Sequence, residues 1–255
     1  EEIAALTDGP KLFQLYVHKD QGLNASMIER CQAAGFDALA LTVDTIVSGK
    51  RERCLRSGFT TPPRFSASSL WSYATRPRWT LDYVFGPKFR LPNLDGHVEE
   101  GSGKAVSIQD YFNTMLDTNM DWDTAARIRQ DWGGTFALKG IMSAGDARKA
   151  VEIGADAIWI SNHGGRQLDG SRAPFDQLTE IVEAVDGEIE IILDGGVRRG
   201  THVLKSLAAG ATAASGGRLY LYALAAAGQD GVERAVQILK EEIERGMRLM
   251  GVTSI

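Results

Sequence analysis

The sequence predicts an α/β protein: a parallel (β/α)8 TIM barrel that lacks its first strands and carries a long insertion after one strand. Short apolar runs rich in β-branched residues alternate with amphipathic helical stretches, which is the pattern of βα units around a parallel sheet. Polar residues follow several of these runs, at the strand ends where a barrel gathers its functional side chains. The 255 residues suit one large domain, and we expect residues 1–255 to form it.

Strands and helices are expected in alternation along the chain. The strands are expected over residues 13–17, 38–43, 135–139, 157–161, 190–193 and 211–216. The last run consists of small residues that form strands weakly, so its place in the alternation supports it more than its composition does. The helices are expected over residues 25–34, 144–153, 175–185, 201–209, 219–227 and 232–250. A closed barrel needs more strands than these, so we expect the natural chain to begin upstream of Glu1.

The alternation stops in an insertion over residues 60–121. Its first half is rich in aromatic and basic residues, a combination typical of segments that rest on an anionic membrane surface. The alternative is that the aromatic side chains pack onto the barrel as a lid. The residues concerned are Trp71, Tyr73, Arg76, Arg78, Trp79, Tyr83, Phe85, Lys88 and Arg90.

Composition and charge exclude several classes of protein. With 44% hydrophobic and 24% charged residues the chain is globular, and its net charge of -5 leaves no basic footprint for nucleic acid. Cys31 and Cys54 are too few for a disulfide framework and lack the spacing of metal ligands, so we expect reduced thiols and no metal site. No apolar run is long enough to span a membrane, and no signal peptide opens the chain. We therefore expect a cytoplasmic protein, with peripheral contact at the inner face of the membrane as an alternative.

The most informative segment is SNHGGRQLDG, residues 161–170, which follows the apolar run at 157–160. His163 can take a proton near neutral pH, and Arg166 offers a planar fork that fits a carboxylate. Together they predict proton abstraction from a small carboxylic acid. The alternative is a helix-entry loop with a solvated histidine and arginine.

Polar side chains end other predicted strands as well. Lys139 ends a buried run, and a buried ammonium group needs an anion or an acceptor beside it. A salt bridge to a neighbouring carboxylate would meet that need without any functional role. The other polar residues at strand ends are Gln14, Tyr16, Thr42, Asp44 and Asp194. Polar groups that converge from different strands are how a barrel assembles a site.

Two glycine-rich turns near the end of the chain suggest a phosphate site. Glycines let backbone N–H groups approach an anion, and the N-terminus of a following helix adds a favourable dipole. The first turn contains Gly196 and Arg198, and the second contains Gly217 and Arg218. Either turn alone is most simply structural. Two turns with an arginine each, after the last two predicted strands, favour bound phosphate.

Five of these segments resemble, in order and spacing, the FMN-dependent L-2-hydroxy acid oxidising family, which includes glycolate oxidase, mandelate dehydrogenase and flavin-type lactate dehydrogenases. The segments are QLY at 14–16, LTVDT at 41–45, KG at 139–140, and residues 161–170 and 194–200. The similarity runs over nearly the whole chain. It implies a barrel with FMN as cofactor, and it implies further strands upstream.

The resemblance implies a role for each matching residue of the reaction site. His163 would be the base, Asp44 would hold its ring, and Tyr16 would hydrogen-bond the substrate hydroxyl. Lys139 would stabilise the negative charge of reduced flavin, which makes it the fourth catalytic residue. These roles agree with the residue types alone: a base, an orienting carboxylate and support for an electron acceptor.

The resemblance also implies the binding residues. Arg51 and Arg166 would grip the substrate carboxylate together with Tyr16 at the hydroxyl. The implied FMN-binding residues are Gln14, Thr42, Lys139, Ser161, Asp194, Gly196, Arg198, Gly217 and Arg218. Of these, Gln14 and Thr42 would contact the flavin ring, and the two glycine turns would hold the phosphate.

The expected function is oxidation of a short L-2-hydroxy acid, with L-lactate first, to the 2-keto acid. His163 would take a proton while two electrons pass to FMN, and the proton could leave from carbon or from oxygen. Quinone, a cytochrome or oxygen would accept the electrons, and a homo-oligomer is compatible with the resemblance. The alternative is an inactive or partner-dependent barrel fragment that binds FMN at most. Another phosphate-binding barrel without flavin explains the glycine turns but not His163, Arg166 and Lys139 together.

Overall fold

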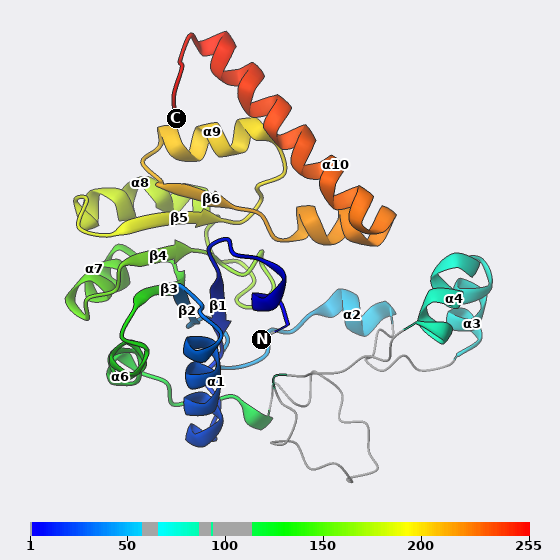
Figure 1. Ribbon diagram of the computed structural model, residues 1–255, viewed down its shortest axis with the longest axis horizontal. Helices are drawn as coiled ribbons and strands as arrows, with labels where there is room; N and C mark the ends of the chain where they lie inside the picture. The colour runs from blue at the N-terminus through cyan, green and yellow to red at the C-terminus, as the bar shows by residue number, and fades with distance from the viewer. Residues whose placement is uncertain (1, 58–65, 87–92, 94–113) are drawn as a thin grey trace.

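The structure, a computed structural model, describes residues 2–57, 66–86, 93 and 114–255. Its six strands form one parallel sheet in which every strand pairs with the next strand along the chain. They are β1 (Leu12–Leu15), β2 (Ala38–Thr42), β3 (Thr135–Ile141), β4 (Ala157–Ile160), β5 (Glu190–Asp194) and β6 (Ala213–Ser215). The sheet curls into part of a barrel (Figure 1), which confirms the predicted α/β class. Within the described residues, β1 and β6 are its edges.

Helices connect the strands and cover the outer face of the curled sheet (Figure 1). The connecting helices are α1 (Gln21–Ala33), α6 (Trp122–Trp132), α7 (Ala144–Glu152), α8 (Pro174–Val185) and α9 (Gly200–Ala208). Helix α10 (Arg218–Met250) closes the chain, and a short 3-10 turn, η1 (Ala4–Leu6), opens it. Helix α10 breaks at Ala227 and Gly228, where the backbone is not helical, so the two predicted closing helices are present as two arms.

The core lies between the outer face of the sheet and these helices. Successive side chains of a strand point to opposite faces. On one face Leu39, Leu41, Phe136 and Leu138 are fully buried within a cluster that includes residues of α1, α6, α7 and α8. Burying each such side chain is worth about 1.5–3 kcal/mol. The alternate residues, among them Lys139, therefore face the hollow of the curled sheet.

The strand register brings the polar strand ends together. Thr42 of β2 pairs with Lys139 of β3, and Lys139 pairs with Trp159 of β4. On the other side Asp194 of β5 pairs with Ser215 of β6. All strands run parallel, so their C-terminal ends meet at one rim of the partial barrel.

The sequence misplaced several boundaries and missed one connecting helix. Helix α1 begins at Gln21 and not at residue 25, because the Asp20 side chain caps it by accepting from the Leu23 amide. Strand β1 ends at Leu15 and leaves Tyr16 in the loop that follows. Helix α6 was not predicted, although Asp121 caps its start and Gly133 takes the left-handed conformation at its end.

Residues 66–86 of the insertion contain two helices, and one short helix precedes the insertion. Short helix α2 (Glu52–Ser57) follows the β2 loop, and α3 (Ala67–Ala74) and α4 (Pro77–Phe85) form a pair that lies apart from the sheet in Figure 1. The rings of Tyr73, Trp79 and Tyr83 stack along this pair, with successive ring centroids 5.5 and 5.3 Å apart. Lys88 and Arg90 of the predicted aromatic and basic patch lie outside the described residues. No helix in the part of the chain that the structure describes has both the length and the apolar character needed to cross a membrane.

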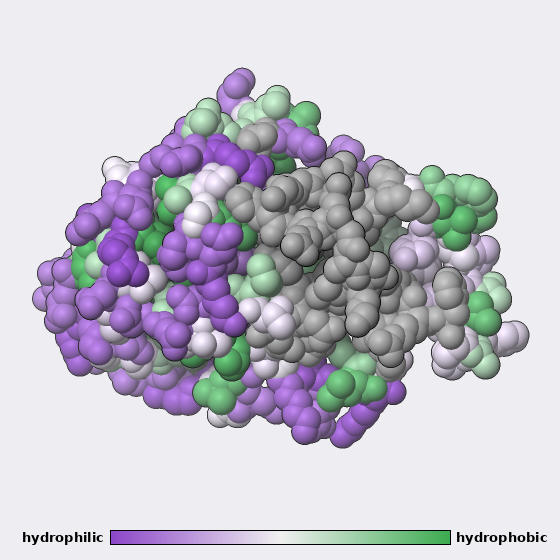
Figure 2. Space-filling model, turned by 90° about the horizontal axis from the view of Figure 1, so that it is seen from below, coloured by the Kyte–Doolittle hydropathy of each residue, from purple (hydrophilic) through white to green (hydrophobic). Residues whose placement is uncertain are grey.

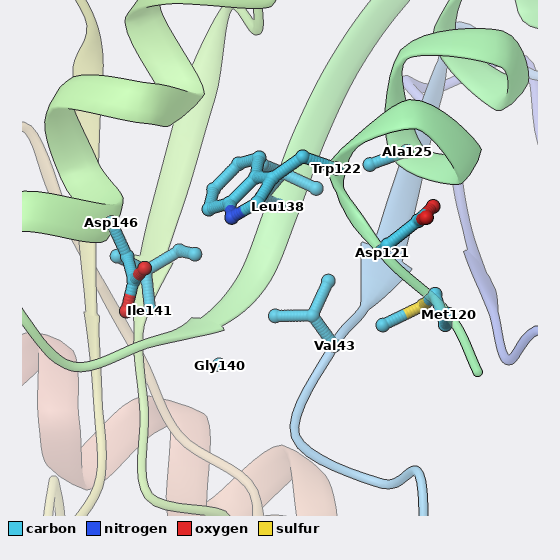
Figure 3. A pocket seen from close by; sticks show the side chains of 9 residues that line it. All are labelled: Val43, Met120, Asp121, Trp122, Ala125, Leu138, Gly140, Ile141 and Asp146. Carbon is cyan, nitrogen blue, oxygen red and sulfur yellow. The ribbon is translucent and has the colours of Figure 1, made fainter. Parts of the chain in front are cut away.

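A cavity of about 290 Å³ lies beside the C-terminal end of β3, against α6 and α7. Figure 3 shows the ring of Trp122 extending into it between the two helices, with Asp146 on the far side. Its lining residues are Val43, Met120, Asp121, Trp122, Ala125, Leu138, Gly140, Ile141 and Asp146. Val43 and Gly140 are next in sequence to Asp44 and Lys139, so this cavity adjoins the polar rim, but none of the predicted site residues lines it.

Candidate functional site

The predicted base and its carboxylate partner are in contact. Asp44 Oδ1 lies 3.2 Å from Nδ1 of His163, and both side chains are largely buried. His163 has a backbone φ of 57°, which is uncommon for a residue other than glycine. Its amide donates to the Ser161 hydroxyl at 3.1 Å, which helps to hold this conformation.

A glycine makes room for Asp44. The pairing of β3 with β4 shifts register between Lys139 and Ile141, and Gly140 lies at this irregularity with φ of +107°. A Cβ atom on Gly140 would lie 2.8 Å from the Cβ atom of Asp44. The irregularity therefore places the Asp44 side chain against the end of β3, in reach of His163.

Three further predicted substrate residues gather around Asp44. Burial raises the pKa of Tyr16, and the nearby Asp44 carboxylate raises it further, while Arg51 and Arg166 oppose both effects. Burial and the neighbouring Arg166 lower the pKa of Arg51. The buried Nε atom of Arg51 has no hydrogen-bond partner among the described residues. Two guanidinium groups and a phenol thus lie near enough to Asp44 and to one another for their charges to interact, which suits a carboxylate that carries a hydroxyl group.

A second cluster lies on the hollow side of the sheet. Lys139 Nζ donates to Ser161 Oγ and Asp194 Oδ2, each at 3.0 Å, and Ser161 Oγ donates to the same Asp194 oxygen at 2.8 Å. The salt bridge considered for Lys139 is therefore present, with Asp194 as its partner. Ser161 Oγ also accepts a hydrogen bond from the His163 amide, so this one hydroxyl connects the two clusters.

The remaining predicted flavin residues fall into two groups. Gln14 Nε2 donates to Thr42 Oγ1 at 2.8 Å, and Thr42 pairs with Lys139 in the sheet. Gly196 and Gly217 border open space, since a Cβ atom on either would have no neighbour within 4 Å. Gly217 precedes α10, whose first turn receives no side-chain cap. Such free amides at a helix start suit a phosphate.

The two arginines of the glycine turns differ in their surroundings. Arg218 Nη2 donates to the Gly164 carbonyl at 2.8 Å, so it links the start of α10 to the loop that carries His163. The side chain of Arg198 makes no ion pair within the described ranges, and its amide donates to Nδ1 of His202. Arg199, the next residue, is paired with Glu242 at 3.2 Å.

The sequence did not predict three residues whose contacts shape the site. The ring of His202 lies against the first glycine turn, with Nδ1 3.0 Å from the Gly196 carbonyl oxygen and 3.2 Å from the Arg198 amide nitrogen. Gly140 was quoted only as a motif letter. Gln167 follows the predicted Arg166 directly and bonds the loop after β2. Adjacency to Lys139 and Arg166 is the signal that could have marked Gly140 and Gln167.

Sequence comparisons find relatives along the whole chain. An L-lactate dehydrogenase of Pectobacterium atrosepticum is 40% identical over 258 residues, which cover 100% of this chain and 66% of that protein. An L-lactate dehydrogenase of Alcaligenes faecalis is 41% identical over 262 residues, covering 100% of this chain and 67% of that protein. The chain thus spans about two thirds of the length of these curated relatives.

Similar solved structures point the same way. The crystal structure of a monotopic membrane protein, (S)-mandelate dehydrogenase, superposes with a TM-score of 0.90 at 34% identity, covering 99% of this chain and 66% of that one. A putative lactate oxidase of Pediococcus acidilactici superposes with a TM-score of 0.75 at 33% identity, covering 98% of this chain and 60% of that one. The sequence pattern of the FMN-dependent dehydrogenases matches residues 1–255. With that match over its entire length, and with a partial barrel that superposes on these enzymes, the chain belongs to the FMN-dependent dehydrogenase family.

Proposed function

We propose that this chain binds FMN and oxidises a short L-2-hydroxy acid, with L-lactate first, to the 2-keto acid. One observation carries the proposal: the His163–Asp44 pair lies beside Arg51 and Arg166, and Ser161 joins it to the cluster of Lys139. A base, a carboxylate-binding group and a cationic group for a cofactor therefore meet at one rim of the sheet. The L-lactate dehydrogenases among the relatives support lactate as the first substrate to test.

The residues at this rim fit FMN. The amide of Gln14, the hydroxyl of Thr42 and the ammonium group of Lys139 offer donors to the polar edge of a flavin ring. Open space at Gly196 and Gly217, beside an uncapped helix start, fits the phosphate. When bound, FMN supplies the two-electron acceptor that side chains lack. We infer that residues 1–255 form one FMN-binding domain with residues 60–121 as its insertion.

The substrate carboxylate would bind between the guanidinium groups of Arg51 and Arg166. A carboxylate there offsets the mutual repulsion of the two cations, which adds to burial in lowering the pKa of Arg51. Tyr16 has a raised pKa, so its phenol stays protonated and can donate to the substrate hydroxyl. These three contacts would fix the hydroxyl-bearing carbon in front of His163.

His163 would act as the base through Nε2, because Asp44 occupies Nδ1. Oxidation of the hydroxy acid removes two electrons and two hydrogens, and His163 takes one of these hydrogens as a proton. The Asp44 carboxylate stabilises the resulting imidazolium and keeps the ring from rotating. The other hydrogen and the electron pair leave the substrate for the acceptor, and a 2-keto acid remains.

The test is the visible spectrum of the purified protein with added FMN, recorded before and after anaerobic L-lactate. Bound flavin that bleaches supports the proposal. Bound flavin that stays oxidised with lactate, glycolate and mandelate contradicts the proposed reaction but not FMN binding. A chain that binds no flavin favours the partner-dependent fragment. His163→Gln should bind FMN normally and lose at least ~10² in the rate of flavin reduction; normal reduction by this variant would exclude His163 as the base.

A second element of the proposal is peripheral contact with a membrane through α3 and α4. Trp71 and Phe85 are 73% and 81% exposed on this pair. Figure 2 shows hydrophobic residues on the end of the molecule where the pair projects. The similar (S)-mandelate dehydrogenase is itself described as a monotopic membrane protein. A membrane location would favour quinone as the electron acceptor over oxygen.

A further inference from the structure

The side chain of Gln167 joins two loops that are far apart in sequence. Its Nε2 atom donates to the backbone carbonyl of Asp44 at 3.0 Å and to that of Val47 at 2.9 Å. Its Oε1 atom accepts from the backbone amide of Gly49 at 3.3 Å. One amide group thus makes three hydrogen bonds to the loop that follows β2.

The two loops also touch through their backbones. A Cβ atom on Gly49 would lie 2.1 Å from the Arg166 carbonyl oxygen and 2.7 Å from the Cα atom of Gln167. Only a residue without a side chain permits this approach. The contact lies two residues before Arg51 in one loop and immediately beside Arg166 in the other.

The loop needs such a contact because it has no regular structure of its own. Residues 43–51 lie between β2 and α2 and form neither helix nor strand. At its start the loop carries Asp44 and at its end Arg51, so the orientation of His163 and one half of the carboxylate site both depend on it.

Electrostatics oppose the arrangement when no substrate is bound. Arg51 and Arg166 repel each other, and this repulsion adds to burial in lowering the pKa of Arg51. A free loop would relieve the repulsion by moving Arg51 into solvent. Hydrogen bonds from the neutral Gln167 side chain hold the loop in place without adding charge.

We infer that Gln167 is a positioning residue, which fixes residues 44–51 against residues 161–170 and so keeps Arg51 and Arg166 preformed for the substrate carboxylate. This inference rests on the proposed function for the identity of the ligand. The hydrogen bonds themselves are independent of it. Preforming the two arginines lowers the cost of ordering the site when the acid binds.

The experiment compares Gln167→Met with the wild-type protein and with Gln32→Met as a matched control. Gln32 also donates two bonds from Nε2 to backbone carbonyls, those of Asp131 and Trp132, but far from the rim. The probe of the carboxylate site is oxalate, titrated by its effect on the flavin spectrum. Gln167→Met should bind oxalate about tenfold more weakly, the equivalent of one or two lost hydrogen bonds. Its affinity for FMN should stay within about twofold of wild type, and Gln32→Met should leave both affinities unchanged.

Two further readouts separate positioning from general stability. Trypsin cleavage after Lys50 or Arg51 in the flavin-free protein should accelerate several-fold in Gln167→Met and not in Gln32→Met. With L-lactate, the half-saturating concentration should rise more than the maximal rate of flavin reduction falls. Gln167→Glu provides a second variant, since it keeps the length of the side chain and the acceptor for Gly49 but loses both donated bonds.

The outcomes are distinct. If wild-type protein binds no oxalate and is not reduced by lactate, glycolate or mandelate, the proposed reaction is wrong, and the trypsin assay alone decides whether Gln167 holds the loop. If Gln167→Met and Gln167→Glu bind oxalate and resist trypsin as wild type does, the inference is overturned. If the variants lose oxalate and FMN binding equally, Gln167 supports the fold in general and the inference is again overturned.

Discussion

The Asp44 carboxylate reaches His163 across 119 positions of sequence, with Oδ1 3.2 Å from the ring Nδ1 atom. Its second oxygen, Oδ2, is buried and has no hydrogen-bond partner among the described residues. An unpaired buried oxygen of this kind is costly to maintain. Asp44 is therefore held toward His163 through one carboxylate oxygen, Oδ1.

Asp44→Asn should slow flavin reduction by at least ~10², because the amide keeps the size of the carboxylate but cannot stabilise the imidazolium by charge. FMN affinity should remain near that of wild type, since Asp44 faces His163 and not the Lys139 cluster. Stopped-flow reduction by L-lactate measures the first quantity and fluorescence titration the second. A loss of less than about threefold would show that the carboxylate only fills space.

Gly140→Ala should displace Asp44 and lower stability. The added Cβ atom would meet that of Asp44 at 2.8 Å, and φ of +107° disfavours any side chain. We expect a loss of about 1–3 kcal/mol in the free energy of unfolding together with slower flavin reduction. Gly187→Ala is the control, because it has φ of +78° but nothing within 4 Å. If both variants lose equal stability and equal activity, the contact with Asp44 is not what requires glycine at position 140.

Lys139→Met should destabilise the flavin-free protein by about 2 kcal/mol or more, because it leaves a largely buried Asp194 carboxylate without its cation. The double variant Lys139→Met/Asp194→Asn should regain most of that stability. It should not regain FMN affinity if Lys139 contacts the flavin. Urea unfolding without FMN and titration with FMN separate the two effects, with Asp194→Asn alone as the reference. A double variant that binds FMN like Asp194→Asn would restrict Lys139 to the ion pair.

The periodicity of apolar residues was sufficient to predict most of the strands and helices. The predicted strand at 38–43 and the predicted helix at 175–185 form β2 (Ala38–Thr42) and α8 (Pro174–Val185), each within one residue of the predicted bounds. Helix α6 escaped detection because only a few apolar residues mark its buried face, and they follow a long insertion. The closing helices were predicted over residues 219–227 and 232–250, and the backbone breaks at Ala227 and Gly228, where the first of them was predicted to end.

The site was predictable only in part from the residues themselves. Side-chain chemistry suggested His163 with Arg166 as one pair and Lys139 as a separate candidate, and the resemblance to a family supplied Asp44 as the partner of His163. Contacts such as those of Gln167 with Asp44 join positions 123 residues apart, and no local pattern encodes them. The same holds for Gly49, whose need for glycine comes from a loop more than a hundred residues away.

The free energy of unfolding should decrease as the pH is lowered, because of His18. This ring is buried at 5% exposure, and burial lowers its pKa below the usual value despite the contact with Asn24. The unfolded chain then takes up the proton first, so the free energy of unfolding falls as the pH drops below about 6.5 and levels off below the folded-state pKa. His18→Gln should have a shallower decline than wild type in urea unfolding between pH 7.5 and 5.5. Equal slopes would assign the decline to other groups.

Helices α3 and α4 should bind vesicles that contain anionic lipid. Trp71 and Phe85 bury apolar surface at the lipid boundary, and basic residues such as Arg78 attract the headgroups. Co-sedimentation of the protein with such vesicles should decrease at high salt, where the charges are screened. It should decrease further in the variant Trp71→Ser/Phe85→Ser.

The control for this experiment is Leu249→Ser/Met250→Ser, which removes exposed apolar surface at the far end of α10. Vesicle binding equal to wild type is expected for it. If instead both double variants sediment alike, α3 and α4 are not the contact. A weaker affinity for the hydroxy acid in Trp71→Ser/Phe85→Ser, with sedimentation unchanged, would make the pair a lid. The two roles separate because a lid acts on the substrate in the absence of lipid, whereas a membrane contact does not.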